Sequence, residues 1–171
     1  MRNDHEEIKI RISGLSNGVH EYHFDALPAD LGLEEAFQTP VSLDVELEKS
    51  SRQLYLKSKI IADGIFICDR CLGEFKQTLS NQMNTVFVYN ESDSKDDDGD
   101  EIRVITPETM SIDITDDVRQ AIILAVPLKM LCSEDCKGLC PHCGVNRNIR
   151  SCKCREIKEI DPRWEKLKKI L

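Results

Sequence analysis

Residues 41–56 read VSLDVELEKSSRQLYL, and their pattern decides the class of fold. Apolar side chains recur at every second position in two runs, Val41, Leu43, Val45 and Leu47, then Leu54 and Leu56. In an extended strand this period places the apolar side chains on one face and the charged ones on the other. The stretch therefore predicts two strands that are each buried on one face and exposed to solvent on the other.

Related patterns continue from this stretch in both directions. Residues 8–12 alternate isoleucines with charged residues, and residues 79–89 alternate again. Residues 60–68 form a more continuous apolar run, interrupted at Asp63-Gly64, which indicates a bend or a bulge. These segments predict a mainly antiparallel sheet that is strongly curved or partly closed. Two further expected elements are a short strand at residues 102–105 and a short helix at residues 29–37.

A longer helix is predicted after the last strand. Thr115 has the character of an N-cap, and Asp116 and Asp117 follow in the first turn, where the helix dipole favours negative charge. An apolar stripe follows, formed by Val118, Ile122, Ala125 and Val126, and Pro127 ends the helix. We expect this helix to cover the sheet, which gives an α+β fold.

Composition divides the chain of 171 residues into two parts. Residues 1–128 form the expected β-rich core domain, with an acidic, solvated loop at residues 91–101. Residues 129–171 hold six of the eight cysteines and end in a lysine-rich tail. The amino terminus MRNDHEEIKI lacks the apolar core of a signal peptide, and no apolar run is long enough to span a membrane. These features predict a cytoplasmic protein without a membrane partner.

The cysteine spacing predicts bound metal, because clustered cysteines in a reducing compartment are more often ligands than disulfides. In Cys140-Pro-His-Cys143-Gly144, the two thiolates of a tight knuckle can converge on one ion, and Cys152-Lys-Cys154 completes four sulfur ligands. Four sulfurs with no open position are typical of structural zinc. His142, between two of these cysteines, is expected to be a bystander.

The other four cysteines form the pairs Cys68/Cys71 and Cys132/Cys136. Together they would make a second tetrahedral zinc site that ties the sheet to the carboxy-terminal segment. Other pairings remain open, including one in which Cys132 or Cys136 displaces a cysteine of the later cluster. The cofactor expected is therefore Zn²⁺, in one site or in two.

Two enzyme classes share parts of this spacing. Cys136, Cys140 and Cys143 have the C-x-x-x-C-x-x-C spacing of radical S-adenosylmethionine enzymes, but only 28 residues follow Cys143, too few for the barrel those enzymes need. Cys68-x-x-Cys71 resembles a redox dithiol, but the residues that follow predict a turn into a strand and not a helix. We therefore expect no catalysis and no small-molecule substrate.

Four segments together resemble the YceD family of bacterial and plastid proteins, described as large ribosomal RNA subunit accumulation proteins. They are FICDRCLGEF at residues 66–75, IDITDDVR at 112–119, CKGLCPHCGVN at 136–146 and DPRWEKLKK at 161–169. The resemblance spans nearly the whole chain. It implies a non-enzymatic ribosome-biogenesis factor that supports the synthesis, processing or stability of large-subunit ribosomal RNA.

Charge is distributed unevenly, which bears on how an acidic chain could contact RNA. The net charge of −8 combines −13 in residues 1–128 with +5 in residues 129–171, and the thiolates of one zinc site would reduce that excess to about +3. RNA contact needs a local basic surface and not a basic total. The candidate RNA-binding residues are Arg147, Arg150, Lys153, Arg155, Lys158, Arg163, Lys166, Lys168 and Lys169.

Two kinds of partner fit this charge distribution. The first is ribosomal RNA, or a large-subunit assembly intermediate, bound through the basic tail. The alternative is a zinc-stapled interaction module that binds a ribosomal or assembly protein without direct RNA contact. Such a partner would be basic and would meet the acidic loop and the negative sheet domain.

Overall fold

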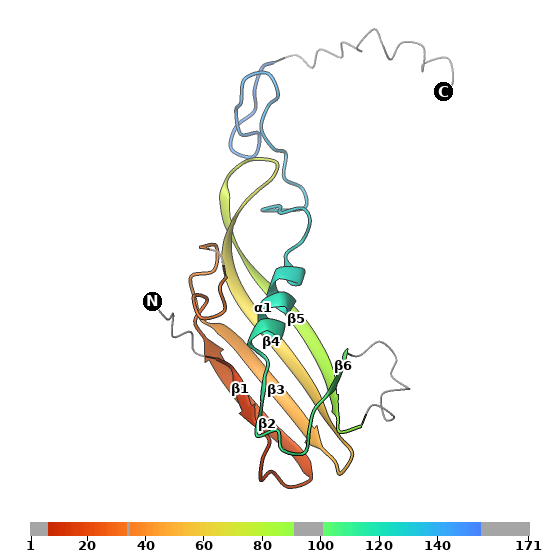
Figure 1. Ribbon diagram of the computed structural model, residues 1–171. Helices are drawn as coiled ribbons and strands as arrows, with labels where there is room; N and C mark the ends of the chain where they lie inside the picture. The colour runs from red at the N-terminus through yellow and green to blue at the C-terminus, as the bar shows by residue number, and fades with distance from the viewer. Residues whose placement is uncertain (1–6, 34, 91–100, 155–171) are drawn as a thin grey trace, which may run out of the picture.

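The computed structural model describes residues 7–33, 35–90 and 101–154 (Figure 1). A five-stranded sheet has the order β2-β3-β4-β5-β6, and a separate two-stranded sheet pairs β1 with β7. The strands are β1 (Lys9–Arg11), β2 (Gly18–Ala26), β3 (Val41–Lys49), β4 (Gln53–Ile67), β5 (Glu74–Val88), β6 (Glu101–Val104) and β7 (Ser111–Asp113). The helix α1 spans Thr115–Ala125 and directly follows β7. In the described residues, no helix has the length and apolar character that crossing a membrane requires.

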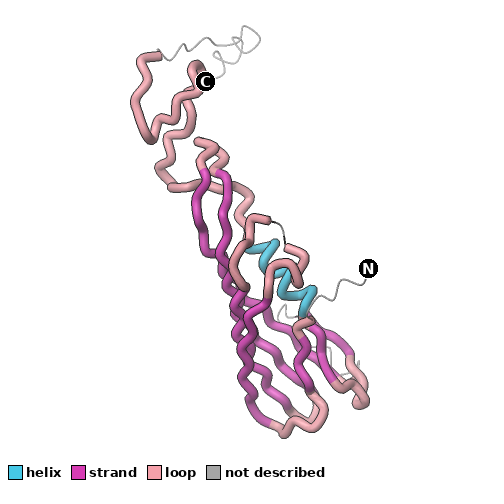
Figure 2. Tube along the Cα trace, turned by 90° about the vertical axis from the view of Figure 1, so that its left-hand side faces the viewer, coloured by secondary structure: helices cyan, strands magenta, loops and turns pink. Residues whose placement is uncertain are grey.

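The core lies on the apolar face that the alternating pattern predicts. Val41, Leu43 and Leu47 of β3 and Leu54 and Leu56 of β4 are all fully buried. The same cluster includes isoleucines of β1 and β7 and the buried side chains of α1, Val118, Ala121 and Ile122. Figure 2 shows α1 lying along the strands. Burial of these apolar side chains is the main source of stability for this layer.

The sheet is open, so of the two predicted alternatives, strongly curved or partly closed, the partly closed sheet is wrong. β2 and β6 are its two edges and do not pair with each other. The sheet is also mixed, because β6 pairs with β5 in parallel. A parallel partner requires a crossover connection of about a dozen residues or more, and residues 89–100 provide that length between β5 and β6.

Of the bend or bulge predicted at Asp63-Gly64, the bulge is absent. β4 pairs with β5 without interruption from Gln53↔Val88 to Ile67↔Glu74. Gly64 instead lets the backbone of residues 36–37 approach β4 closely. Phe37 forms a β-bridge with Gly64, and Ile65 N–H donates to the Ala36 carbonyl at 2.8 Å. A Cβ at position 64 would lie 2.5 Å from the Phe66 ring.

Another local prediction, the short helix, is wrong for a physical reason. Residues 29–33 and 35–37, the described part of this segment, contain turns and no helix, and Gly32 there has φ of +59°, outside the right-handed helical region. Apolar alternation did not predict β2, because this strand lies at the edge of the sheet and its side chains are all exposed or half-buried. The acidic loop at residues 91–101 lies outside the described residues apart from Glu101.

The β4–β5 hairpin extends beyond the rest of the sheet. β3 pairs with β4 only as far as Ile61, whereas β4 and β5 continue pairing to Ile67 and Glu74. The turn at residues 68–73 therefore projects toward the carboxy-terminal segment (Figure 1). This projection positions the first pair of cysteines.

Thr115 does not cap the helix. The N-cap is Ile114, and no side chain makes a capping hydrogen bond there. The Thr115 hydroxyl instead accepts a hydrogen bond from the Ile8 backbone N–H at 2.8 Å, which ties the helix start to the residues just before β1. Thr115 therefore makes a tertiary contact across more than a hundred residues of sequence.

We expect Thr115→Val to lower the free energy of unfolding by about 1–2 kcal/mol, because the half-buried Ile8 N–H loses its acceptor. Thr115→Ser keeps the hydroxyl and should cost less. Urea unfolding followed by circular dichroism measures both. Equal losses for the two variants would contradict the role assigned to the hydroxyl.

Candidate metal centres

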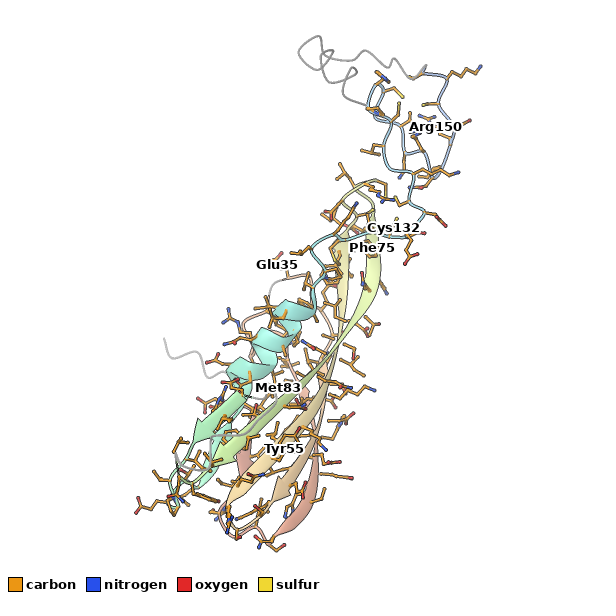
Figure 3. All side chains as sticks on the ribbon, turned by 90° about the vertical axis from the view of Figure 1, so that its right-hand side faces the viewer. Glu35, Tyr55, Phe75, Met83, Cys132 and Arg150 are labelled. Atoms are coloured by element: carbon orange, nitrogen blue, oxygen red, sulfur yellow. The ribbon has the colours of Figure 1, made fainter. Side chains whose placement is uncertain are left out.

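The first cysteine quartet joins the hairpin tip to the segment that follows α1. Cys68 and Cys71 lie in the β4–β5 turn, and Cys132 and Cys136 lie beyond the helix. The four Sγ atoms all lie within 4.8 Å of one another. Cys68, Cys71 and Cys136 are buried in a small apolar cluster with Phe75 and Leu131, and Figure 3 shows Cys132 close to Phe75 at this tip.

The sulfur spacing suits a tetrahedral metal ion. Cys68 Sγ lies 3.7 Å from Cys136 Sγ, and Cys71 Sγ lies 3.7 Å from Cys132 Sγ. Sulfurs bound to one zinc ion at about 2.3 Å in a tetrahedron are about 3.8 Å apart. A disulfide would instead need about 2.05 Å between sulfurs. The donor set and its spacing therefore fit a metal ion.

Hydrogen bonds hold the two contributing segments together around this quartet. Asp69 and Met130 bond twice: Asp69 N–H donates to the Met130 carbonyl at 2.8 Å, and Met130 N–H donates to the Asp69 carboxylate at 2.7 Å. The Arg70 guanidinium donates to the carbonyls of Glu134 and Cys136, both at 3.0 Å. The turn and the later segment thus bring the four sulfurs together.

The second quartet contains Cys140, Cys143, Cys152 and Cys154, whose Sγ atoms again lie within 4.8 Å of one another. Cys140 N–H donates to the Val145 carbonyl at 2.8 Å, and Gly144 N–H donates to the Cys140 carbonyl at 2.9 Å. Gly144 has φ of +70°, which closes the knuckle that its sequence predicts. Cys140 is buried, whereas Cys143 and Cys154 are exposed.

Asn148 connects the two quartets. Its side-chain amide donates to Cys136 Sγ at 3.3 Å, and its side-chain carbonyl accepts from Lys137 N–H at 2.7 Å. A residue of the second loop therefore supports a sulfur of the first quartet. Groups of this kind orient metal ligands and affect metal affinity.

Gly138 allows a close backbone contact between the hairpin tip and the later segment. A Cβ there would lie 2.9 Å from the Arg70 carbonyl, and φ at this residue is +70°. That same carbonyl accepts a hydrogen bond from Leu139 N–H at 2.9 Å. Glycine is thus required both by the conformation and by the space.

The thiols of each quartet differ in how readily they ionise. Hydrogen bonds from backbone N–H groups lower the pKa of Cys68 to about 6, and the largest contribution comes from the N–H of Cys132. The N–H groups of Cys143 and His142 lower the pKa of Cys140 to about 6 in the same way. The Asn148 amide lowers the pKa of Cys136. Hydrogen bonding to neighbouring thiols raises the pKa of Cys132 and of Cys154 to about 12. The largest contribution comes from Cys136 for Cys132 and from Cys143 for Cys154. A divalent cation would favour the thiolate at all four positions.

The arrangement separates the cysteines of both enzyme-like motifs. Cys136 groups with the hairpin cysteines, so it does not converge with Cys140 and Cys143 as an iron–sulfur motif requires. Cys68 begins a hairpin turn in which Leu72 N–H donates to the Cys68 carbonyl, and no helix begins there. His142 is exposed and belongs to neither quartet.

Of the candidate RNA-binding residues, the structure describes Arg147, Arg150 and Lys153, and all three are exposed around the second quartet. The others, Arg155, Lys158, Arg163, Lys166, Lys168 and Lys169, lie outside the described residues. Sequence reasoning missed Asp69, Arg70, Gly138 and Asn148 as residues that support the quartets. Their roles depend on backbone atoms of segments distant in sequence, for which a single sequence carries no signal.

We expect the purified chain to bind two zinc ions, and Cys68→Ser and Cys140→Ser each to reduce the content to one. Each substitution removes a thiolate from a different quartet. Elemental analysis of the metal measures this, with Ser133→Ala as a control that keeps all eight cysteines. One zinc ion in the unaltered chain, or iron in its place, would contradict the assignment.

Alanine substitutions at two glycines separate the effect of the close backbone contact at Gly138 from the effect of positive φ alone. Gly138→Ala and Gly144→Ala both force alanine into a φ of +70°, but only at position 138 does the new Cβ meet another backbone atom. We expect Gly144→Ala to lower the free energy of unfolding by about 1 kcal/mol from the conformation alone. Gly138→Ala should cost more and should release metal faster from the first quartet. Denaturation of the metal-loaded chain and metal transfer to a chelator measure both effects, and equal behaviour of the two variants would refute the contact.

Comparison with known proteins places these residues in a family. The family model "Large ribosomal RNA subunit accumulation protein YceD" matches residues 57–171, which include every cysteine of both quartets. The uncharacterized protein Rv2926c of Mycobacterium tuberculosis is 32% identical over 148 residues, which cover 84% of this chain and 70% of that protein. The uncharacterized protein YlbN of Bacillus subtilis is 26% identical, over 78% of this chain and 75% of that protein.

A plant protein with a functional name also matches. The chloroplastic large ribosomal RNA subunit accumulation protein YCED homolog 1 of Arabidopsis thaliana is 41% identical over 54 residues, which cover 31% of this chain and 17% of that protein. No solved structure matches the chain. From the extent of the family match and the identity to the mycobacterial relative, we conclude that this chain belongs to the YceD family.

Proposed function

We propose that this protein is a non-enzymatic ribosome-biogenesis factor that supports the synthesis, processing or stability of large-subunit ribosomal RNA. The observation that carries the proposal is the family match over residues 57–171, whose description names large-subunit RNA accumulation. The matched region contains the hairpin except for the first four residues of β4, together with the helix and both cysteine quartets. Its partners would be ribosomal RNA or large-subunit assembly intermediates, together with a ribosomal protein, in the cytoplasm.

In this proposal both quartets hold structural zinc. Four thiols with the spacing of a tetrahedral site leave no position for a substrate, which is typical of structural and not of catalytic zinc. The ions would hold the carboxy-terminal segment on the hairpin tip. The chain itself supplies the ligands, the backbone N–H groups that favour thiolates, and the Asn148 contact between the sites.

The surface around the second quartet is the proposed RNA contact. Lys137, Arg147 and Arg150 line one shallow hollow with Asn148 and Ser151, and Lys153 is exposed nearby. Phosphate contacts by clustered lysine and arginine side chains position RNA without reading its sequence. The hollow therefore suits a phosphate backbone.

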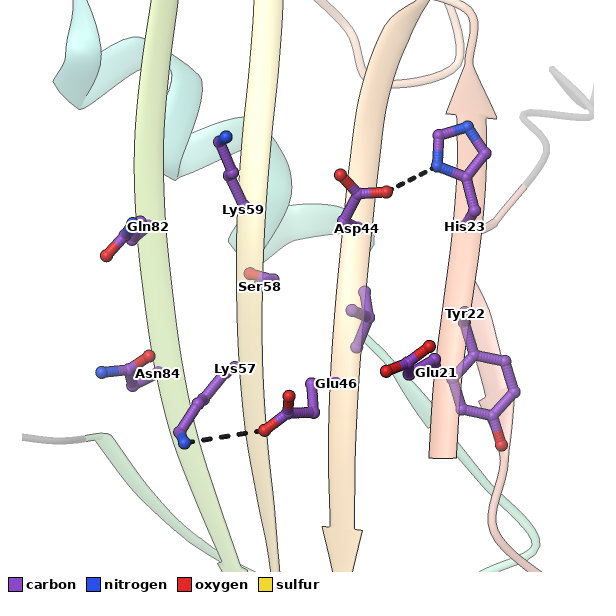
Figure 4. Close-up of a pocket in the computed structure, with 11 residues that line it drawn as sticks. Glu21, Tyr22, His23, Asp44, Glu46, Lys57, Ser58, Lys59, Gln82 and Asn84 are labelled. Carbon is purple, nitrogen blue, oxygen red and sulfur yellow. Dashed lines mark hydrogen bonds and ion pairs between the residues drawn. The ribbon is translucent and has the colours of Figure 1, made fainter. Parts of the chain in front are cut away.

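The broad hollow on the sheet differs from the surface around the second quartet, because polar side chains that line it are exposed to solvent and paired with one another. Figure 4 shows side chains of β2, β3, β4 and β5 around it, with Lys57 paired to Glu46 and His23 bonded to Asp44. Lys57 and Glu46 are both about half exposed. We assign no catalysis and no small-molecule substrate to this face.

Depletion and sedimentation test the function directly. We expect depletion to lower the amount of large-subunit ribosomal RNA and the protein to sediment with large-subunit precursors. Unchanged RNA levels and a protein that stays at the top of the gradient would refute the proposal. Association that survives complete nuclease digestion would instead support the protein-interaction module without direct RNA contact.

Charge reversal tests the proposed RNA surface. We expect Arg150→Glu with Lys153→Glu to weaken binding to large-subunit RNA and to reduce the slope of log affinity against log salt by about 1.4–1.8, since each lost phosphate contact contributes about 0.7–0.9. The matched control is Lys57→Glu with Lys59→Glu, which makes the same charge change on the sheet. Zinc content must be unchanged in both variants. Equal weakening by the two double variants would show that net charge, and not this surface, governs binding.

A further inference from the structure

The outer edge of β2 is a long backbone surface without a partner in the described part of the chain. β2 pairs with β3 over nine residues, from Gly18↔Lys49 to Ala26↔Val41, without a bulge. Its remaining backbone N–H and C=O groups make no hydrogen bond to any described residue. Such an edge is a template for another strand, and proteins usually block it with proline, bulges, short length or charged side chains. β2 has no proline, no bulge and nine residues, so its protection is limited to the exposed charges of Glu21 and Asp25, which would repel an acidic strand and attract a basic one.

The two faces of β2 define what a strand added to it would meet. On the core side, Tyr22 and Phe24 are half-buried, and their rings stack at 6.3 Å between centroids. Figure 4 shows the Tyr22 ring reaching past β2 on the side away from β3. On the solvent side, Glu21, His23 and Asp25 are exposed. An added strand would cover the aromatic rings with one face and meet carboxylates with the other.

The carboxylate of Glu21 has no compensating positive charge among the described residues, so a basic side chain would be favourable beside it. Glu21 lies directly opposite Glu46 in the ladder, and like charges at opposed positions are unfavourable. Glu46 is paired with Lys57, whereas Glu21 makes no ion pair with any described residue. The Asp25 carboxylate lies 3.5 Å from His23 Nε2 and is 64% exposed, so it too can receive a cation.

We propose that the β2 edge binds an extended segment of a basic partner protein by strand addition, with lysine or arginine alternating with apolar residues. Backbone hydrogen bonds would provide affinity, and the alternation would provide specificity. The apolar side chains would pack beside Tyr22 and Phe24, and the basic ones would lie over Glu21 and Asp25. This surface belongs to the sheet, so it holds or fails independently of RNA contact at the second quartet.

The test uses the full zinc-loaded chain and a synthetic nine-residue peptide that alternates lysine and valine, with both ends blocked. Nuclear magnetic resonance should show saturable shifts at residues 18–26 and slower amide exchange there. A peptide of the same sequence, methylated on alternate backbone nitrogens, should not bind, because it cannot complete the ladder. A glutamate–valine peptide should also fail to bind.

Charge variants locate the site. Glu21→Lys with Asp25→Lys should weaken peptide binding about fivefold, the scale expected for two exposed ion pairs. The matched control, Glu74→Lys with Glu108→Lys, makes the same charge change at exposed positions outside β2 and should leave binding unchanged. Shifts confined to other residues, equal binding of the methylated peptide, or equal loss in both variants would overturn the proposal. A stable dimer with β2 already protected would also overturn it, because a second copy would then occupy the edge.

Discussion

The uninterrupted pairing of β4 with β5 is the constraint on which the rest of the structure depends. One continuous ladder joins these strands from Gln53↔Val88 to Ile67↔Glu74. Its lower part carries β3 and β6 and helps to bury the core, and Asn81 in its middle donates to the Ala121 carbonyl of α1 at 2.8 Å. Its upper part has no neighbouring strand beyond Ile61, so the turn reaches the carboxy-terminal segment. A one-residue slip in the register of this ladder would move every side chain of the shifted strand to the opposite face.

The hairpin tip shows how a few backbone contacts organise cysteines far apart in sequence. The Arg70 carbonyl accepts from Leu139 N–H, and the Arg70 side chain donates to two carbonyls of the same segment. These bonds place Cys136 near Cys68, although 68 residues separate them. A metal ion at this point would close a long loop, and closing long loops removes the most entropy from the unfolded chain. The second quartet is local in sequence and would close only a short loop.

The distribution of charge follows the same division between the sheet and the tip. The sheet carries exposed carboxylates along β2 and β3, and the segment around the second quartet carries exposed lysine and arginine. An elongated molecule keeps these two surfaces apart (Figure 1). Opposite charges at opposite ends allow a protein to meet a polyanion at one end and a basic partner at the other.

The sequence by itself determined the elements whose signal is local. The alternation of Val41, Leu43, Val45 and Leu47 defines a strand, and the Cys140–Gly144 knuckle defines a turn that brings two thiols together, because each depends on residues a few positions apart. Only the tertiary structure decided that the sheet is open, that β6 runs parallel to β5, that Thr115 bonds to Ile8 and not to its own helix, and that Cys136 joins Cys68 and not Cys140. Each of these results depends on which distant backbone groups come together when the apolar faces are buried, and no local pattern encodes that choice.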